Sequence, residues 1–271
     1  MAKKEGNVAE IIQIPDFWEL FRKNRPRFLG LDYDGTLAPF HVDPMQARPL
    51  PGVADLVGRL AADGQTRVAI ISGRPVVEVM SLLGNPPVTI IGSHGFELWP
   101  VDGARVVRQP QPIQQQGLDT IHQWIRHQPF RPKLERKVAS LAVHTRGLDP
   151  VEALNIEEQI AATWGEQGLL YDLECRRFNG GVEIRCAGWD KGAALTELLD
   201  MQPEQIWPVY VGDDETDEDA FTVVRGRGIG IKVGDASWPT AAAGFLPDCT
   251  AVVDFLRTWV ELTETERREK P

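Results

Sequence analysis

Short apolar runs alternate with amphipathic segments on either side of the middle of the chain. Each run is long enough for one buried strand and ends in turn residues such as glycine, aspartate or serine. Four such runs lie at residues 27–35, 66–75, 88–95 and 208–214. Residues 52–64 and 190–200 carry apolar side chains at the spacing of an amphipathic helix. Strands that alternate with helices predict an α/β fold built on a Rossmann-like parallel sheet.

The middle of the chain has a different pattern. Residues 109–117 are rich in proline and glutamine, and the strand-like pieces after them alternate polar and apolar side chains. Such alternation is typical of an antiparallel sheet with one face away from a hydrophobic core. We therefore predict an inserted α+β cap domain at residues 109–188 and a core domain formed by residues 1–108 and 189–271.

The composition is that of a soluble globular protein, with 42% apolar and 25% charged residues in a chain of 271. The formal net charge of -10 argues against nucleic acid or an anionic membrane as partner, because both select basic surfaces. The three cysteines form no C-x-x-C pair, and the first residues lack the apolar run of a signal peptide. No apolar stretch approaches the roughly 18 residues that span a membrane. We expect a cytoplasmic monomer.

Two carboxylates follow the first predicted strand. Asp32 and Asp34 are two residues apart, so on an extended chain they point the same way. One carboxylate could attack an electrophile while the other moves protons, and oxygen ligands of this kind also suit Mg²⁺. The alternative is a tight turn, since Asp34 precedes Gly35 and Asp-Gly is a common turn pair.

A second acidic cluster follows the last predicted strand. Six of the eight residues at 212–219 carry carboxylates. An EF-hand calcium loop is excluded, because Glu218 stands where that loop needs glycine. Acidic residues also cap helix N-termini, but one or two suffice for that purpose. The cluster therefore indicates a divalent cation, with Asp213 and Asp214 among its candidate ligands.

Two further positions could hold a phosphate group. Ser72, Gly73 and Arg74 follow the second predicted strand, where a hydroxyl and backbone amides could bind an anion, although an ordinary turn explains the same residues. Lys191 opens the helix after the insert, with Asp190 as its N-cap. A lysine is unfavourable beside the positive end of a helix unless an anion binds there. Lys191 is thus a candidate phosphate ligand, and the alternative is an ordinary lysine exposed to solvent.

The insert carries cations and carboxylates that could recognise a hydroxyl-rich, phosphorylated ligand. His144 and Arg146 lie two apart on one predicted strand and share a face, as do Glu183 and Arg185 on another. The candidate binding residues of the insert are Glu135, Lys137, His144, Arg146, Glu183 and Arg185. An ordinary charged sheet face would have the same composition, so both interpretations stay open at this point.

Taken together, these motifs resemble the haloacid dehalogenase superfamily. DYDGTL, ISGR, a lysine that opens a helix and GDDETDED look like the four motifs of that superfamily, and the insert resembles its larger α+β cap. Finer matches across roughly residues 27–260 resemble the trehalose-6-phosphate phosphatase family: LDYDGTLAPFHVDPMQARP, IGSHGFELW, ERKVASLAVHTR, GGVEIRCAGWDKGAAL and YVGDDETDEDAF. Ser93, Cys186 and Asp190 depart from that family, which usually has asparagine, proline and asparagine there.

The resemblance implies a role for each candidate. Asp32 resembles the nucleophile and Asp34 the general acid and base, while Ser72 and Lys191 resemble the pair that holds the phosphate. The Mg²⁺ ligands that it implies are Asp32, the backbone carbonyl of Asp34, Asp213 and, in or near the shell, Asp214 and Asp217. Gly73, Arg74 and His94 join the six residues of the insert as candidates for binding the sugar phosphate.

The function that the resemblance implies is Mg²⁺-dependent hydrolysis of trehalose 6-phosphate through an aspartyl-phosphate. One group of alternatives is other capped phosphatases, acting on sucrose-phosphate, glucosylglycerol-phosphate or mannosyl-phosphoglycerate. A phosphosugar mutase and a catalytically silent sugar-phosphate sensor are further alternatives. Asp32 and Asp34 together argue against a sensor, because a pure binder has no evident need for both. A metal-binding structural module would leave Ser72 and Lys191 unexplained.

Overall fold

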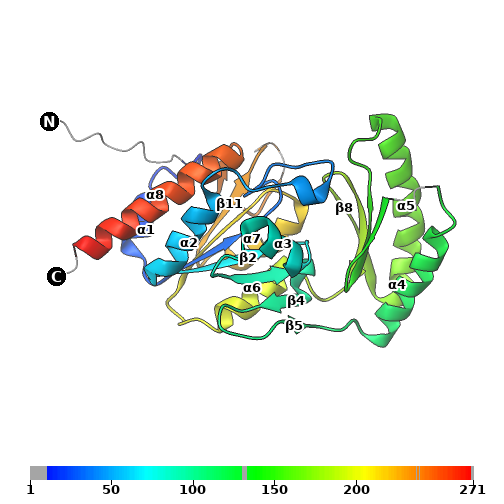
Figure 1. Cartoon of the computed structure of the whole chain (residues 1–271), viewed down its shortest axis with the longest axis horizontal. Coiled ribbons are helices and arrows are strands. Elements are labelled where there is room, and N and C mark those ends of the chain that lie inside the picture. The colour runs from blue at the N-terminus through cyan, green and yellow to red at the C-terminus, as the bar shows by residue number, and fades with distance from the viewer. Residues whose placement is uncertain (1–10, 130–132, 236, 238, 270–271) are drawn as a thin grey trace.

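The chain folds into two parts, each built on its own sheet (Figure 1). The computed structural model describes residues 11–129, 133–235, 237 and 239–269. The larger sheet has eight strands, in the spatial order β12 (Gly244–Leu246), β11 (Ile229–Val233), β10 (Trp207–Gly212), β1 (Arg27–Leu31), β2 (Thr66–Ile71), β3 (Thr89–Gly92), β4 (Glu97–Trp99) and β5 (Val106–Val107). The strands from β12 to β3 are parallel, and β4 and β5 add an antiparallel edge. The predicted α/β fold is confirmed.

Helices cover both faces of the larger sheet. On one face, buried side chains of the sheet pack against α1 (Phe17–Lys23), α2 (Val53–Asp63), α3 (Val76–Leu83) and α8 (Cys249–Arg268). On the other face they pack against α6 (Lys191–Asp200) and α7 (Glu218–Val224). Because both faces are covered, the central strands are apolar throughout, as the sequence pattern indicates. Among the described residues, short 3₁₀ turns join the strands to later elements: η1 (Pro44–Gln46), η2 (Ser93–Gly95) and η4 (Glu215–Asp217).

The second part is a four-stranded antiparallel sheet backed by two helices. Its strands are β6 (Leu134–Arg136), β7 (Ser140–His144), β9 (Gly181–Cys186) and β8 (Leu173–Phe178), in that spatial order. The helices α4 (Pro112–Ile125) and α5 (Pro150–Tyr171) bury the apolar face of this sheet. We call residues 112–186 the cap and the remaining described residues the core. The domain boundaries at 109–188 stay a prediction.

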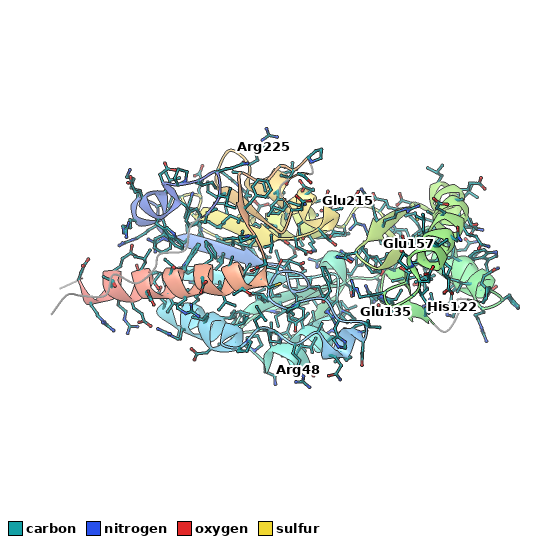
Figure 2. All side chains as sticks on the ribbon, turned by 90° about the horizontal axis from the view of Figure 1, so that it is seen from above. Arg48, His122, Glu135, Glu157, Glu215 and Arg225 are labelled. Carbon is teal, nitrogen blue, oxygen red and sulfur yellow. The ribbon has the colours of Figure 1, made fainter. Side chains whose placement is uncertain are left out.

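The polar face of the cap sheet follows from its alternation. On β9, Val182 and Ile184 lie in the apolar cluster with the helices, so Glu183 and Arg185 lie on the opposite face. Figure 2 shows the two parts as lobes, with Glu135 and Glu215 near the region where they meet. Among the described residues, no helix has both the length and the apolar character needed to span a bilayer.

Candidate active site

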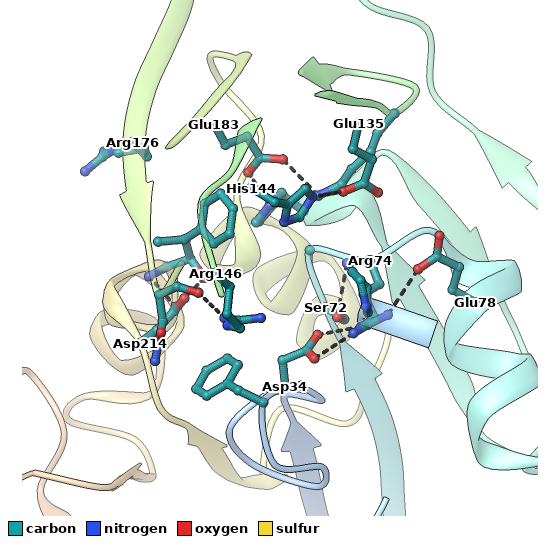
Figure 3. Close-up of a pocket in the computed structure, with 18 of the residues that line it drawn as sticks. Asp34, Ser72, Arg74, Glu78, Glu135, His144, Arg146, Arg176, Glu183 and Asp214 are labelled. Atoms are coloured by element: carbon teal, nitrogen blue, oxygen red, sulfur yellow. Dashed lines mark hydrogen bonds and ion pairs between the residues drawn. The ribbon is translucent and has the colours of Figure 1, made fainter. Parts of the chain in front are cut away.

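The carboxyl ends of three neighbouring parallel strands form one side of a pocket. Asp32 directly follows β1, Ser72 follows β2 and Asp213 follows β10. Ligands of open α/β sheets bind at this edge. The pocket measures about 530 Å³ and has the cap on its other side (Figure 3). The site therefore lies between the two parts of the molecule.

Lys191 lies at the base of the pocket between two buried carboxylates. Its Nζ is 2.9 Å from Asp32 Oδ1 and 2.8 Å from Asp217 Oδ1. The lysine opens α6, where the Asp190 side chain accepts a hydrogen bond from Ala193 N at 2.7 Å. Burial opposes the charge on Lys191, but these carboxylates raise its pKa well above the ordinary value. The site thus holds a fixed cation beside Asp32.

Asp217 has no oxygen left for a ligand. Oδ1 accepts hydrogen bonds from Lys191 Nζ and from Tyr210 OH, the latter at 2.6 Å. Oδ2 accepts from the backbone N–H groups of Asp213 and Asp214, at 3.0 and 3.1 Å. Four donors satisfy the four lone-pair positions of a carboxylate. Asp217 therefore holds Lys191 and the acidic loop, our name for residues 212–219, in place. This supporting role differs from the role of Asp214.

The acidic loop supplies oxygen ligands for a cation. Asp32, Asp213 and Asp217 each place a carboxylate oxygen within 4.8 Å of the others. Burial and the neighbouring carboxylates raise the pKa of Asp213 well above the ordinary value, and burial does the same for Asp32 despite Lys191. Crowded, buried carboxylates that resist ionisation are what a hard divalent cation would stabilise. Since Asp217 has no free lone pair, Asp32 and Asp213 fit Mg²⁺ best.

Asp214 is partly committed to the loop itself. Its Oδ1 accepts hydrogen bonds from Thr216 N at 2.8 Å and from Thr216 Oγ1 at 2.7 Å. Asp214 lines the pocket, whereas Asp213 is not one of the lining residues and has its carboxylate beside Gly35. Gly35 has φ +70°, and a Cβ there would lie 2.1 Å from Asp213 Oδ2, so the turn after β1 needs glycine.

Arg74 holds the second carboxylate of the β1 motif. Its Nε donates to Asp34 Oδ2 at 2.6 Å and its Nη2 to Asp34 Oδ1 at 2.8 Å, as Figure 3 shows. The remaining Nη1 donates to Glu78 at 3.2 Å. Arg74 also belongs to the phosphate turn, our name for residues 72–74, in which its backbone N–H donates to Ser72 Oγ at 3.2 Å. Arg74, predicted to bind substrate, thus positions Asp34 in this structure.

The cap side of the pocket carries a buried charged cluster. Glu183 accepts hydrogen bonds from Lys137 Nζ at 3.0 Å and Ser140 Oγ at 2.7 Å, and lies 2.8 Å from His94 Nε2 of the core. Burial opposes ionisation of Glu183, but Lys137 and His94 hold its pKa well below the ordinary value. Beside this cluster, His144 Nε2 lies 2.7 Å from Glu135 Oε2.

The structure brings nearly all the predicted residues into one pocket. Those that line it are Asp32, Asp34, Ser72, Gly73, Arg74, His94, Glu135, Lys137, His144, Arg146, Glu183, Lys191 and Asp214. Arg185 does not line the pocket, although it shares a face with Glu183. Its Nη2 lies 3.4 Å from Glu174 Oε2 and 3.7 Å from Asp219 Oδ2. Arg185 is therefore a link between cap and core in this structure, and its contact with substrate stays a prediction.

Two aromatic rings line the pocket that sequence reasoning missed. Phe40 comes from the core loop after the β1 motif and Phe178 from the end of β8. The guanidinium of Arg146 lies 4.6 Å from the centre of the Phe40 ring, and the His144 and Phe178 rings are 5.6 Å apart. Phe40 stands inside a motif quoted above, which was a usable signal, whereas nothing in the sequence singles out Phe178.

A family model and related sequences of known proteins match this chain, and all carry the same family description. The sequence model of the family described as trehalose-phosphatase matches residues 30–249. A trehalose 6-phosphate phosphatase of Zea mays is 32% identical over 260 residues, covering 87% of this chain and 70% of the relative. A trehalose-phosphate phosphatase of Mycobacterium tuberculosis is 32% identical over 237 residues. That match covers 83% of this chain but only 59% of the mycobacterial relative.

Solved structures share the fold. The C-terminal domain of the Candida albicans trehalose-6-phosphate phosphatase superposes with a TM-score of 0.77 at 23% identity, covering 94% of this chain and 99% of that one. A haloacid dehalogenase-like hydrolase from Bacteroides thetaiotaomicron has a TM-score of 0.59 at 17% identity, covering 89% and 99%. At these identities the likeness concerns the fold.

Proposed function

This chain belongs to the trehalose-phosphatase family, and from that premise we propose that it hydrolyses trehalose 6-phosphate to trehalose and phosphate with Mg²⁺ as cofactor. The observation that carries the proposal is the buried contact between Asp32 and Lys191, at the bottom of a pocket whose other side is the cap. This contact places a carboxylate nucleophile beside a cation that can hold the phosphate. We further propose that the protein acts in the cytoplasm, as a monomer.

The chemistry divides between two carboxylates. An oxygen of Asp32 attacks phosphorus and forms an aspartyl-phosphate, while the bond from phosphorus to the sugar oxygen breaks and that oxygen takes a proton from Asp34. In the second step Asp34 takes a proton from water, which attacks phosphorus and frees Asp32. Both Asp34 oxygens accept hydrogen bonds from Arg74 in this structure, so protonating one of them opens one of these bonds.

Other core residues of the pocket neutralise the negative charge of the phosphate group and hold that group in position. Lys191 and the phosphate turn hold the phosphate oxygens, which is most of what phosphoryl transfer requires. Asp32 and Asp213 would hold Mg²⁺, with Asp214 and the backbone carbonyl of Asp34 near it. The ion would offset the repulsion between the phosphate and Asp32.

The cap would recognise the sugar. Glu135 and His144 form one polar pair on the pocket wall, and Lys137 and Glu183 form another. Mixed donors and acceptors of this kind suit a ligand with many hydroxyl groups. A pocket that lies between cap and core can also exclude bulk water while the aspartyl-phosphate exists.

An Asp34→Asn variant tests the covalent step. Its amide can neither protonate the sugar oxygen nor take a proton from water, so the test uses p-nitrophenyl phosphate, whose leaving group needs no acid. With this ester the first step should still proceed while the second step slows, and the aspartyl-phosphate should accumulate. We expect mass spectrometry after an acid quench to find one added phosphoryl group on the peptide that contains Asp32. If that peptide carries no phosphoryl group and an Asp32→Asn enzyme still turns over, the mechanism is wrong.

A further inference from the structure

One buried side chain of the core contacts both the cap and the phosphate turn. It is His94, which belongs to η2 at the end of β3. We propose that His94 is a positioning residue for phosphoryl transfer. It transmits the position of the cap, through its contact with Glu183, to the phosphate turn. The inference rests on the proposed phosphatase function and adds a role for a side chain that the mechanism above does not use.

The contact between His94 and the cap is short and buried. His94 Nε2 lies 2.8 Å from Glu183 Oε2, and the two residues are only 6% and 4% exposed. The cap–core ion pairs among the described residues are longer than this contact. Arg176 lies 3.6 Å from Glu215, which is 64% exposed in its side chain, and Arg185 lies 3.7 Å from Asp219. The hydrogen bond between His94 and Glu183 is thus the shortest of these three contacts and the one in which both side chains are buried.

The imidazole of His94 also packs against the phosphate turn. A Cβ on Gly73 would lie 2.6 Å from His94 Cε1 and 2.7 Å from Nε2, so the imidazole occupies the space that a side chain would need. The backbones are also joined: His94 N donates to Ser72 O at 3.2 Å, and Ser93 N donates to Arg74 O at 2.8 Å. A shift of His94 therefore moves the phosphate turn with it.

Two features of this residue cost stability and indicate selection for function. Ser93 and His94 have φ values of +49° and +53°, in the left-handed region that side chains disfavour. The Nδ1 atom of His94 is buried and finds no partner among the described residues. Since Nε2 carries the proton donated to Glu183, Nδ1 is an acceptor without a donor. A phenyl ring would fill the same space without this cost, but it could not bind Glu183.

The test compares two phosphate esters in the full chain with Mg²⁺. Trehalose 6-phosphate engages the cap, whereas p-nitrophenyl phosphate has no sugar for the cap to bind. His94→Phe keeps a ring on Gly73 but removes the bond to Glu183. His94→Gln has an amide nitrogen at the position of Nε2 and can restore that bond. Asp119→Asn is the matched control, because it removes an exposed ion pair within the cap, between residues that do not line the pocket.

We expect His94→Phe to lower kcat for trehalose 6-phosphate by at least about tenfold, with KM changed by less than about threefold. Turnover of p-nitrophenyl phosphate should stay within about twofold of wild type. His94→Gln should recover most of the lost kcat, and Asp119→Asn should match wild type with both esters. If His94→Phe does not fold, His94→Asn takes its place, because its amide is too short to reach Glu183.

Three results would overturn the role of His94: an equal loss with both esters, a rise in KM alone, and no change at all. The first would make the residue a support of the core, and the second a direct substrate ligand. A wild-type protein that releases phosphate from neither ester would overturn the proposed function and this inference with it. Hydrolysis of a different sugar phosphate would overturn the substrate assignment alone, and the His94 comparison is then decided with that ester.

Discussion

At the scale of single residues, the carboxylates of the acidic loop have two different roles: some are candidate metal ligands, and others hold neighbouring groups in place. Asp217 gives all its lone pairs to protein donors, while no donor among the described residues forms a hydrogen bond with the Asp213 carboxylate. The sequence predicts the cation from the density of carboxylates at 212–219. It cannot assign their roles, because the partners of Asp217 include Lys191 and Tyr210, which are brought to it by folding. The roles of Asp32, Asp34, Ser72 and Lys191 are predicted by the resemblance of their motifs to a known family rather than by the residues alone.

Replacing Asp213 should separate metal binding from folding. An acid whose pKa is raised in the folded state opposes folding at neutral pH, and protonation at lower pH relieves this cost. We expect Asp213→Asn to raise the metal-free free energy of unfolding by about 1 kcal/mol or more. We also expect it to abolish the increase in Tm that Mg²⁺ gives the wild type.

Denaturant unfolding in EDTA and thermal unfolding across a Mg²⁺ series measure these two effects. Asp254→Asn, on the exposed surface of α8, is the control and should keep the Mg²⁺-dependent shift. An Asp213→Asn protein that Mg²⁺ stabilises as much as the wild type would show that the ion binds elsewhere.

At the scale of elements, the alternation of β9 predicts which face a side chain occupies but not what it meets there. Glu183 and Arg185 share the polar face as expected. Glu183 lines the pocket, whereas Arg185, two residues farther along β9, lies near Glu174 and Asp219. The difference depends on how the cap sheet is placed against the core, which no local pattern encodes. The core strands were easier to predict, because their apolar runs end at the sheet edge that holds the motifs.

Lys137 should be the main electrostatic support of the cap sheet. It is buried between Glu183 at 3.0 Å and Glu135 at 3.9 Å. Lys137→Met leaves these carboxylates without their cation, so we expect a loss of roughly 3–5 kcal/mol in the free energy of unfolding at pH 7. The neighbouring Arg136→Met removes only an exposed pair with Asp119 and should cost about 1 kcal/mol or less.

The loss caused by Lys137→Met should shrink in acid. The pKa of Glu183 is lowered in the folded wild type, so its stabilising effect is present above its ordinary value of 4.5 and is lost as pH falls through the folded value. Without Lys137 that effect is already absent at neutral pH. Urea unfolding from pH 7 to pH 3.5 should show the two proteins converging, and a constant difference would mean that packing, not charge, explains the loss.

At the scale of the whole molecule, the pocket exists only because cap and core face each other. Its apolar lining illustrates this, since Phe40 belongs to the core and Phe178 to the cap. Because the two residues are far apart in the sequence, no local sequence pattern predicts that they line the same pocket. Arg146 connects the two parts here: its Nη1 donates to His41 O at 3.2 Å, and its guanidinium lies over the Phe40 ring.

Arg146→Ala should therefore weaken use of the sugar phosphate more than phosphoryl transfer itself. We expect kcat/KM for trehalose 6-phosphate to fall by about 10- to 100-fold. The kcat/KM for p-nitrophenyl phosphate should fall by less than about threefold. Arg257→Ala removes an exposed arginine of α8 and should leave both values unchanged. Equal losses with both esters after Arg146→Ala would remove the cap from substrate recognition.

The most direct test of the central claim is phosphate release across a panel of sugar phosphates with Mg²⁺. The panel includes trehalose 6-phosphate, sucrose-phosphate, glucosylglycerol-phosphate and mannosyl-phosphoglycerate, with EDTA and Asp32→Asn as controls. We predict strong selectivity for trehalose 6-phosphate, loss of turnover in EDTA, and a fall of at least about 1,000-fold for Asp32→Asn, which should still bind the ester. Preference for another ester would contradict the substrate assignment, and a fully active Asp32→Asn enzyme would contradict the mechanism.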